Sequence, residues 1–392
     1  MGGLILESFG CWYKPDASQK NESVESKNVG GEILEPEFDL HVNFWFLGDI
    51  LKQKISDPYL DIGIKIKEYE KLSSLVFSFP FQVLEQNVID LASKMSDKTN
   101  ASIVFNEECE IETEKEYTII KIPEKEKDKE IEKKLLIFPL TQAIEHIYEL
   151  TACENKSYIT IKFDEFKRYL TKDSKLSSYH DIYIRFRIRD VSLQNVLYFD
   201  SEPFNKSLDS AFSGTRVLDF KINEKRNIDK SITAKMDLDE KVLVEFEQVH
   251  FLVMEPSSYD MISYTQNQMT CRELEKNLWN DYLSDYTPVE LNDKAGHVLA
   301  YHWKAKKKDK KIRDFSCFAK INYQKMQMKT VLAYVLVAIG IGVIGSTIVS
   351  VTPLVNSFFS WNPKQYILQD FGLDLLFSLV IILVGRGLGK SK

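Results

Sequence analysis

The sequence contains little cysteine and no recognisable signal peptide. Five cysteines occur among 392 residues, without a C-x-x-C pair. Their odd number and wide spacing argue against a disulfide framework and favour reduced thiols in the cytosol. The first residues, MGGLILESFGCWYKPD, lack the basic region of a secretory signal and contain only a short apolar run. The cysteines are Cys11, Cys109, Cys153, Cys271 and Cys317.

Catalytic motifs are also lacking. Neither G-x-S-x-G nor H-E-x-x-H occurs, and the six histidines are dispersed without metal-ligand spacing. A G-x-G-x-x-G pattern is present at Gly340, Gly342 and Gly345, but it lies inside a long apolar run. A dinucleotide-binding loop needs these glycines between a strand and a helix, so the pattern is not expected to bind a dinucleotide here. We therefore predict no enzymatic activity, no cofactor and no metal.

Negative charge dominates most of the chain but not its C-terminal part. Residues 1–303 hold 37 Lys/Arg and 54 Asp/Glu, a net charge of −17, whereas residues 304–392 hold 14 Lys/Arg and 4 Asp, a net charge of +10. An acidic 1–303 region argues against general nucleic-acid binding. The basic charge is concentrated in 304–329, immediately before a run without charged residues.

Two apolar runs predict a C-terminal transmembrane hairpin. The first, 330–355, exceeds the roughly 20 residues that cross a bilayer core, and the second, 366–386, just covers it. Lys and Arg flank the pair while the connection holds only Lys364, so the positive-inside rule places both termini in the cytoplasm. We predict a multi-pass protein of the cell inner membrane, with the lipid bilayer as partner. The juxtamembrane segment 304–329 either contacts anionic headgroups or serves only as a topology signal.

Small residues recur every fourth position along the first predicted span. Such a row allows a second helix to approach closely and predicts a packing seam, either within the chain or between copies in a homo-oligomer. In the second span, Asp374 is an intramembrane ionisable residue or lies at the outer headgroup boundary. The seam residues are Ala338, Gly342, Ser346 and Ser350.

Residues 35–303 predict a cytosolic domain that is mainly β (α+β). Apolar and polar residues alternate in FDLHVNFWF, DIGIKIK, IYIRFRIR and several other segments. Helical periodicity is found over Val83–Met95 and Cys271–Leu283. We expect residues 1–34 to be a loose N-terminal tail and Glu124–Lys134, rich in Glu and Lys, to be a solvated connection.

Two parts of this domain resemble each other. Leu60–Phe81 and His180–Phe204 both read Asp-Ile-x-Ile, then alternating basic and apolar residues, then a turn and a short strand ending in Pro-Phe. This similarity predicts an internal duplication, with repeats at about 58–150 and 178–256. Chance similarity between amphipathic strands is the alternative.

The segment IYIRFRIR places three arginines on one strand face. In a regular strand, each of Arg185, Arg187 and Arg189 lies about 6.7 Å from the next. Such a ladder of guanidinium groups suits a phosphate chain, a nucleotide or nucleic-acid regulator, or an acidic protein. Pairing with acidic residues of a neighbouring strand is the alternative.

The layout resembles that of two-transmembrane-helix effectors of bacterial anti-phage defence systems. The resemblance rests on the hairpin at 330–386 and on the size of the preceding domain, without a shared motif. It implies a cytosolic domain that senses or restrains and a hairpin that assembles to permeabilise the inner membrane. A membrane-anchored scaffold or adaptor without toxic activity is the alternative.

Overall fold

The structure is a computed structural model of the 392-residue chain. It describes residues 7–16, 35–46, 58–114, 117–126, 129–137, 139–140, 147–170, 181–189, 197–201, 213–265, 269–283, 297–306, 310–324, 328–359, 379–380 and 383. The chain divides into two compact units. Unit 1 comprises Met1–Phe199 and Val217–Ile321, and unit 2 comprises Asp200–Arg216 and Asn322–Lys392.

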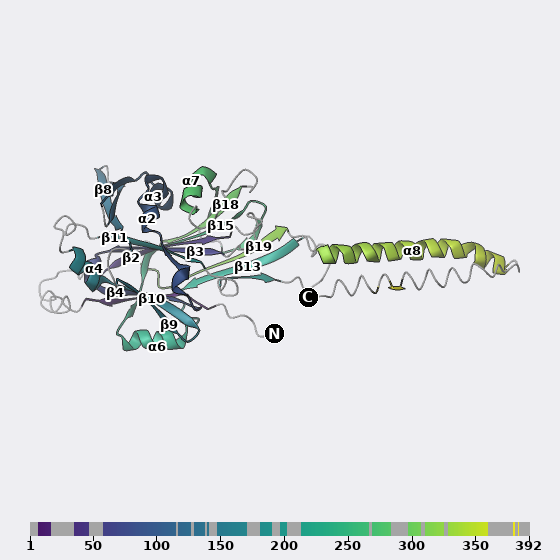
Figure 1. The fold of residues 1–392 in the computed structure, drawn as a ribbon, viewed down its shortest axis with the longest axis horizontal. Helices are drawn as coiled ribbons and strands as arrows, with labels where there is room; N and C mark the ends of the chain where they lie inside the picture. Colours follow the sequence, from purple (N-terminus) through teal and green to yellow (C-terminus); the bar gives the residue numbers. More distant parts are fainter. Residues whose placement is uncertain are drawn as a thin grey trace. The chain divides into compact units, whose positions relative to one another are not determined.

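The fold is mainly β, as predicted, and the strands of the described residues form three sheets (Figure 1). The ten-stranded sheet runs β17 (Met269–Glu273), β18 (Val298–Lys306), β15 (Phe246–Pro256), β2 (Glu37–Trp45), β3 (Tyr59–Lys67), β11 (Asp181–Arg189), β8 (Lys129–Ile137), β7 (Thr118–Glu126) and β6 (Glu110–Thr113), with β5 (Val88–Asp90) also paired to β11. The five-stranded sheet runs β14 (Val242–Leu243), β1 (Gly10–Pro15), β4 (Leu72–Phe79), β10 (Lys156–Lys162) and β9 (Tyr148–Cys153). The third sheet runs β12 (Tyr198–Ser201), β13 (Ser213–Ile222), β19 (Phe315–Gln324) and β16 (Asp260–Tyr264).

Helices are fewer than strands in the described part of the chain. Two turns of 3-10 helix, η1 (Tyr69–Lys71) and η2 (Glu85–Asn87), connect strands. The α-helices are α2 (Ala92–Met95), α3 (Lys98–Phe105), α4 (Phe163–Leu170), α6 (Lys230–Leu238), α7 (Lys276–Leu283) and α8 (Met328–Phe359).

The ten-stranded sheet has one apolar face and one polar face. Alternation along β2 places Phe38, Leu40 and Val42 on the apolar face, where each is at most 1% exposed. This face packs toward the five-stranded sheet, as shown by the ring contact between Phe186 of β11 and Phe77 of β4, 6.3 Å between centroids. The core of unit 1 therefore lies between these two sheets.

Short helices cover parts of the polar face, on the side away from β4 and β10 (Figure 1). Asp97 caps α3 by accepting a hydrogen bond from the Asn100 backbone N–H, and Asn106 ends the helix in the left-handed conformation. Ala101 packs over the β7–β8 end of the sheet, while Trp279 of α7 packs over the β2–β15–β18 end. The polar side chains between these two clusters are left facing a cavity.

Three segments that we expected to lie outside the fold contain strands. Residues 10–15 of the predicted tail form β1, because Phe9, Cys11 and Trp12 are buried in the core; residues 17–34 lie outside the described residues. The run 124–134 is not a free connection, since Glu124 pairs with Ile131 at the end of the β7–β8 hairpin. The basic segment 304–329 contains the end of β18 and all of β19.

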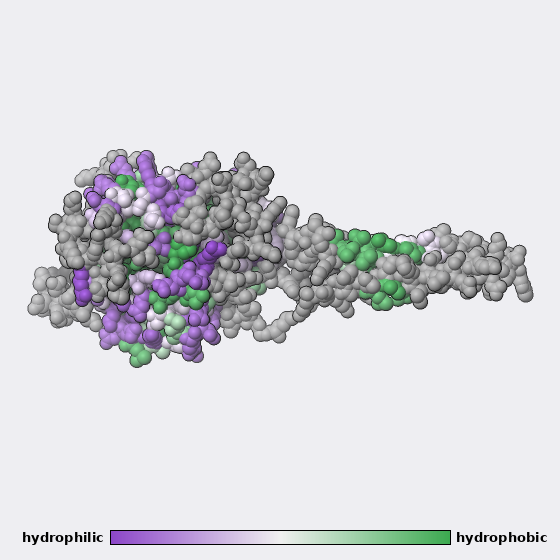
Figure 2. Space-filling view, viewed as in Figure 1, coloured by the Kyte–Doolittle hydropathy of each residue, from purple (hydrophilic) through white to green (hydrophobic). Residues whose placement is uncertain are grey.

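The predicted transmembrane hairpin and inner-membrane location are wrong as far as the described residues test them. In that part of the chain no helix combines the length and the apolar character needed to cross a membrane. The first apolar run is within α8, and nearly all of 366–386 lies outside the described residues. The prediction rested on apolar composition, which is not specific to helices that cross a membrane. Several apolar side chains of α8 are exposed in unit 2 (Figure 2), namely Leu332, Val335, Ile339 and Ile341.

Candidate functional site

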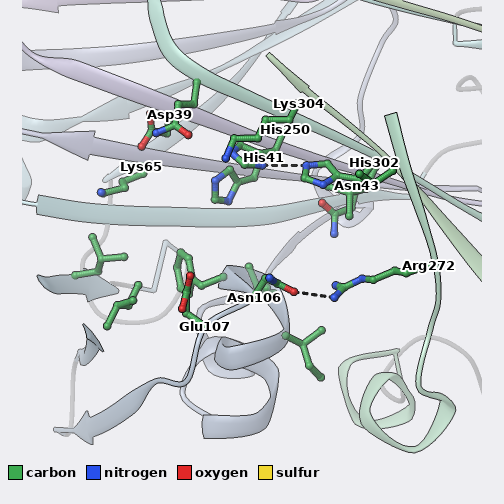
Figure 3. A pocket seen from close by; sticks show the side chains of 18 of the residues that line it. Asp39, His41, Asn43, Lys65, Asn106, Glu107, His250, Arg272, His302 and Lys304 are labelled. Atoms are coloured by element: carbon green, nitrogen blue, oxygen red, sulfur yellow. Dashed lines mark hydrogen bonds between the residues drawn. The ribbon is translucent and has the colours of Figure 1, made fainter. Parts of the chain in front are cut away.

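A cavity of about 580 Å³ opens on the polar face of the ten-stranded sheet, within unit 1 (Figure 3). Its floor consists of alternate residues from four adjacent strands, and its opposite wall is the C-terminal end of α3 with Asn106 and Glu107. We call it the polar cavity. The polar floor residues are Lys65 of β3, Asp39, His41 and Asn43 of β2, Gln248 and His250 of β15, and His302 and Lys304 of β18.

Three histidines form a row across the floor of the polar cavity. His41 and His250 are direct partners in the parallel pairing of β2 with β15, and their ring centroids are 4.9 Å apart. The His250 and His302 rings are stacked, with His250 Nδ1 3.0 Å from His302 Nε2. One ring nitrogen of this pair must donate and the other accept, which requires at least one neutral imidazole.

Burial keeps the histidines of the row uncharged at neutral pH. Burial first, and then His302 and Lys304, lower the pKa of His250 to about 3. Burial and the charges of Lys304 and Arg272 lower the pKa of His302 to about 4. The pKa of His41 is held well below its usual value by burial, His250 and Arg185. The row therefore offers neutral donors and acceptors to the cavity.

Lys65 is a buried amine beside this row. The residue is 6% exposed, and its Nζ lies 3.9 Å from Asp181 Oδ2 of β11. Asp39 faces it in the β2–β3 pairing, and Lys133 of β8 lines the same cavity. Burial, together with the adjacent Lys133, lowers the pKa of Lys65 to about 7. Lys65 thus exists as both ammonium and free amine at neutral pH.

Positive charge exceeds negative charge around the polar cavity. Four cationic side chains line it, Lys65, Lys133, Arg272 and Lys304, against the two carboxylates of Asp39 and Glu107. Arg272, exposed on the edge strand β17, donates from Nη1 to Asn106 Oδ1 over 2.7 Å (Figure 3). Three of the four cations, Lys65, Lys133 and Arg272, come from residues 1–303, whose net charge is −17.

Two members of the arginine ladder predicted from the sequence are buried beside the polar cavity. Arg185 and Arg187 are 1% and 0% exposed. Arg187 donates two hydrogen bonds to Asp61, from Nε to Oδ1 at 2.5 Å and from Nη2 to Oδ2 at 2.9 Å. Asp61 is the cross-strand neighbour of Arg187. This is the alternative given above, in which an arginine of the ladder pairs with an acidic residue of a neighbouring strand and not with a ligand. Arg189, at the end of the strand, lies with its guanidinium over the Tyr59 ring.

Aromatic hydroxyls connect this arginine network with the histidine row. Tyr282 donates to Asp61 Oδ2 over 2.7 Å, and its oxygen accepts from Arg185 Nε over 2.8 Å. Arg185 Nη1 also donates to the Tyr183 hydroxyl over 2.8 Å, which in turn lies 3.3 Å from His41 Nδ1. The network therefore fixes the positions of the floor residues, and its guanidinium groups donate their hydrogen bonds to Asp61, Tyr183 and Tyr282 within the protein.

The helix-packing seam is only partly described. Ala338, Gly342 and Ser346 are exposed on α8, and, apart from the adjoining turns of α8 itself, the described residues leave open space at the position of a Cβ on Gly342. Ser350 belongs to α8, but its side chain lies outside the described residues, as does Asp374 entirely. The predicted helix association and the role of Asp374 stay predictions.

The residues of the polar cavity were not predicted from the sequence. His41, His250 and His302 looked dispersed because they are far apart along the chain, and only strand pairing brings them together. A signal was nevertheless present: each histidine occupies the polar side of an alternating strand, as in the segment FDLHVNFWF. No group of three or more His, Cys, Asp or Glu with metal-binding geometry occurs among the described residues.

Comparisons with known proteins identify no family for the chain. No family model matches, and neither does any curated protein. Among solved structures, the Fcho1 Mu homology domain of Danio rerio with a bound Eps15 peptide is aligned over 75% of this chain and 80% of that chain, at 8% identity and a TM-score of 0.16. A likeness at this TM-score carries no argument about fold or function.

Proposed function

We propose that unit 1 is a ligand-binding domain whose polar cavity takes a small organic anion. The observation that supports this most is the gathering of Lys65, Lys133, Arg272 and Lys304 around one cavity whose lining holds two carboxylates, Asp39 and Glu107. Buried polar side chains cost free energy unless they are paired, so a row of them facing open space suits a site that pairs with a ligand.

The wall of the polar cavity suggests an anion with an apolar or aromatic body. Phe105 and Trp279 line the cavity together with aliphatic side chains of α3 and β8. A volume of about 580 Å³ is within the range of small-molecule sites, which are typically about 300–1,000 Å³. Lysine and arginine would recognise phosphate or carboxylate, while the neutral imidazoles accept or donate hydrogen bonds.

This proposal keeps the sensing part of the sequence-based hypothesis and omits its membrane part. Permeabilisation by a hairpin required two spanning helices, and no described helix qualifies. Regulation by a nucleotide is a special case of the ligand class proposed, with the site moved from the arginine ladder to the polar cavity. Anti-phage defence and an adaptor role have no support from the cavity.

We expect the full chain to bind phosphorylated aromatic compounds and not their neutral parents. Isothermal titration calorimetry would compare pyridoxine 5′-phosphate and nucleoside monophosphates with pyridoxine and the nucleosides. Arg272→Gln combined with Lys304→Gln removes two lining cations and should weaken anion binding at least about tenfold, since charge-assisted hydrogen bonds contribute about 1.5–3 kcal/mol each.

The matched control for that variant is Arg313→Gln with Lys98→Gln. Both residues have exposed side chains, at 82% and 59%, and neither lines the polar cavity. The control should leave anion affinity within about twofold, because exposed charges outside the site are screened by salt. Failure of every anion to bind, or equal loss in the two double variants, would contradict the proposal.

A further inference from the structure

We propose that Lys65 captures its ligand covalently, as an imine formed with a carbonyl group, so that the ligand class is an organic anion bearing an aldehyde or ketone. This inference rests on the proposed anion-binding function of the polar cavity and adds a reaction to it. It depends on the position of one amine, among neighbours of both charges, in a cavity large enough for a small molecule.

The surroundings of Lys65 differ from those of an ordinary surface lysine. Its side chain emerges from β3, an inner strand, and lines the polar cavity although the residue is only 6% exposed. The charged groups that face it come from three other strands: Asp39 of β2, Asp181 of β11 and Lys133 of β8. An ammonium neighbour and a dry position are the two features that activate lysine amines toward carbonyl compounds.

The reaction balances without an oxidant, a reductant or a metal. The lone pair of the neutral Lys65 Nζ attacks the carbonyl carbon and the C=O electrons move to oxygen. A proton passes from nitrogen to that oxygen to give a carbinolamine. Loss of water, made of the carbonyl oxygen and the two amine hydrogens, forms the C=N bond. Two carboxyl groups beside Lys65 can move these protons: Asp181, 3.9 Å from Nζ, and Asp39, the cross-strand neighbour of Lys65.

The electrostatics agree with this assignment. A lysine with a pKa of about 7 is half in its neutral form at pH 7, whereas an exposed lysine at about 10.4 is neutral in only about one molecule in 2,500. Burial raises the pKa of Asp39, which favours a carboxyl group able to give a proton to the departing hydroxyl. The cations Arg272 and Lys304 remain available for the anionic group of the ligand.

The test compares two probes that differ only in the reactive group. Pyridoxal 5′-phosphate carries an aldehyde, and pyridoxine 5′-phosphate carries an alcohol at the same position. The full chain is incubated briefly with each probe at pH 7 and reduced with cyanoborohydride, and modified lysines are located by peptide mass spectrometry. We expect modification by the aldehyde alone, with Lys65 labelled at least about tenfold faster than Lys98, whose side chain is 59% exposed.

Variants separate an activated amine from a merely accessible one. Lys133→Met removes the neighbouring ammonium, so the pKa of Lys65 should rise and its labelling at pH 7 should slow, about fivefold for a rise of one unit, with the rate recovered at higher pH. Lys65→Arg keeps a cation but cannot form an imine, so the rapid single-site label should disappear.

The outcomes distinguish this inference from the proposed function. Binding of pyridoxine 5′-phosphate without preferential labelling of Lys65, or a Lys133→Met variant that labels as fast as the natural protein, would overturn imine formation and leave anion binding standing. If no anion bound, the nucleoside monophosphates and both pyridoxine-type phosphates included, both proposals would fail together. Preferential labelling of Lys65 that slows with Lys133→Met supports both.

Discussion

Asp61→Asn should destabilise the protein by about 3–5 kcal/mol, the usual loss when one partner of a buried ion pair is removed. Asp61 is fully buried and receives hydrogen bonds from Arg187, Trp45 and Tyr282. Burial alone would raise the pKa of Asp61, but the charge and hydrogen bonds of Arg187 bring that pKa below its usual value. The loss of stability should appear as a lower urea concentration at the midpoint of unfolding, with an unchanged dependence of the unfolding free energy on urea concentration.

The control for this prediction is an exposed aspartate in a similar pair. Asp239, 44% exposed, lies 2.9 Å from Lys241, and Asp239→Asn should cost no more than about 1 kcal/mol. A double variant, Asp61→Asn with Arg187→Met, should recover part of the loss because it removes the guanidinium left without its carboxylate. Equal stability of the two single variants would show that the Asp61 network does not hold the sheet face together.

Acidification from pH 7 to pH 5 should destabilise the protein through the histidine row. In the unfolded chain these residues take up protons near pH 6.5, whereas the folded-state pKa values of His250 and His302 are about 3 and about 4. The unfolded state therefore binds more protons between about pH 6.5 and pH 4, and the free energy of unfolding falls as pH falls through this range. At pH 5 each of the two contributes a loss of at most about 2 kcal/mol.

Replacement of the histidines tests the origin of this pH dependence. The double variant His250→Gln with His302→Gln should show a clearly shallower decline in unfolding free energy between pH 7 and pH 5. His297→Gln is the matched control, because His297 is exposed and does not line the polar cavity. If the double variant kept the full decline of the natural protein, the row would not be held neutral by the fold.

The strands were largely predictable because their side chains alternate. In β2, β3 and β11 the sequence alone separates an apolar face, such as Ile182, Ile184 and Phe186, from a polar one. What alternation does not reveal is whether the polar side meets solvent. Here α3 and α7 cover much of it, so Arg185 and Arg187 are buried against Asp61 although their pattern resembles that of a solvated face.

The candidate site was not predictable because it depends on strand order. His41, His250 and His302 become neighbours only through a parallel pairing of β2 with β15 and an antiparallel pairing of β15 with β18. The matched segments of the proposed duplication are also neighbours, since β3 and β11 pair along their whole length. That pairing does not test the duplication, which stays a prediction.

The helix predictions failed where segments with helical periodicity of apolar residues instead pair with a neighbouring strand. Val83–Met95 contains η2, β5 and α2 in place of one helix, because β5 pairs with β11. In Cys271–Leu283 only the second half is helical, since the first half is the edge strand β17. The apolar run at 330–355 does form a helix, α8, but its membrane assignment came from composition alone.

The most direct test of the central claim is histidine side-chain NMR of the full chain during titration with pyridoxine 5′-phosphate. Anion binding in the polar cavity predicts saturable shifts of the His41, His250 and His302 ring resonances, while the exposed His297 ring outside the cavity stays unchanged. The midpoint of these shifts should agree with the calorimetric affinity. Calorimetric binding that leaves the three cavity histidines unshifted would contradict the account, because the anion would then be bound elsewhere.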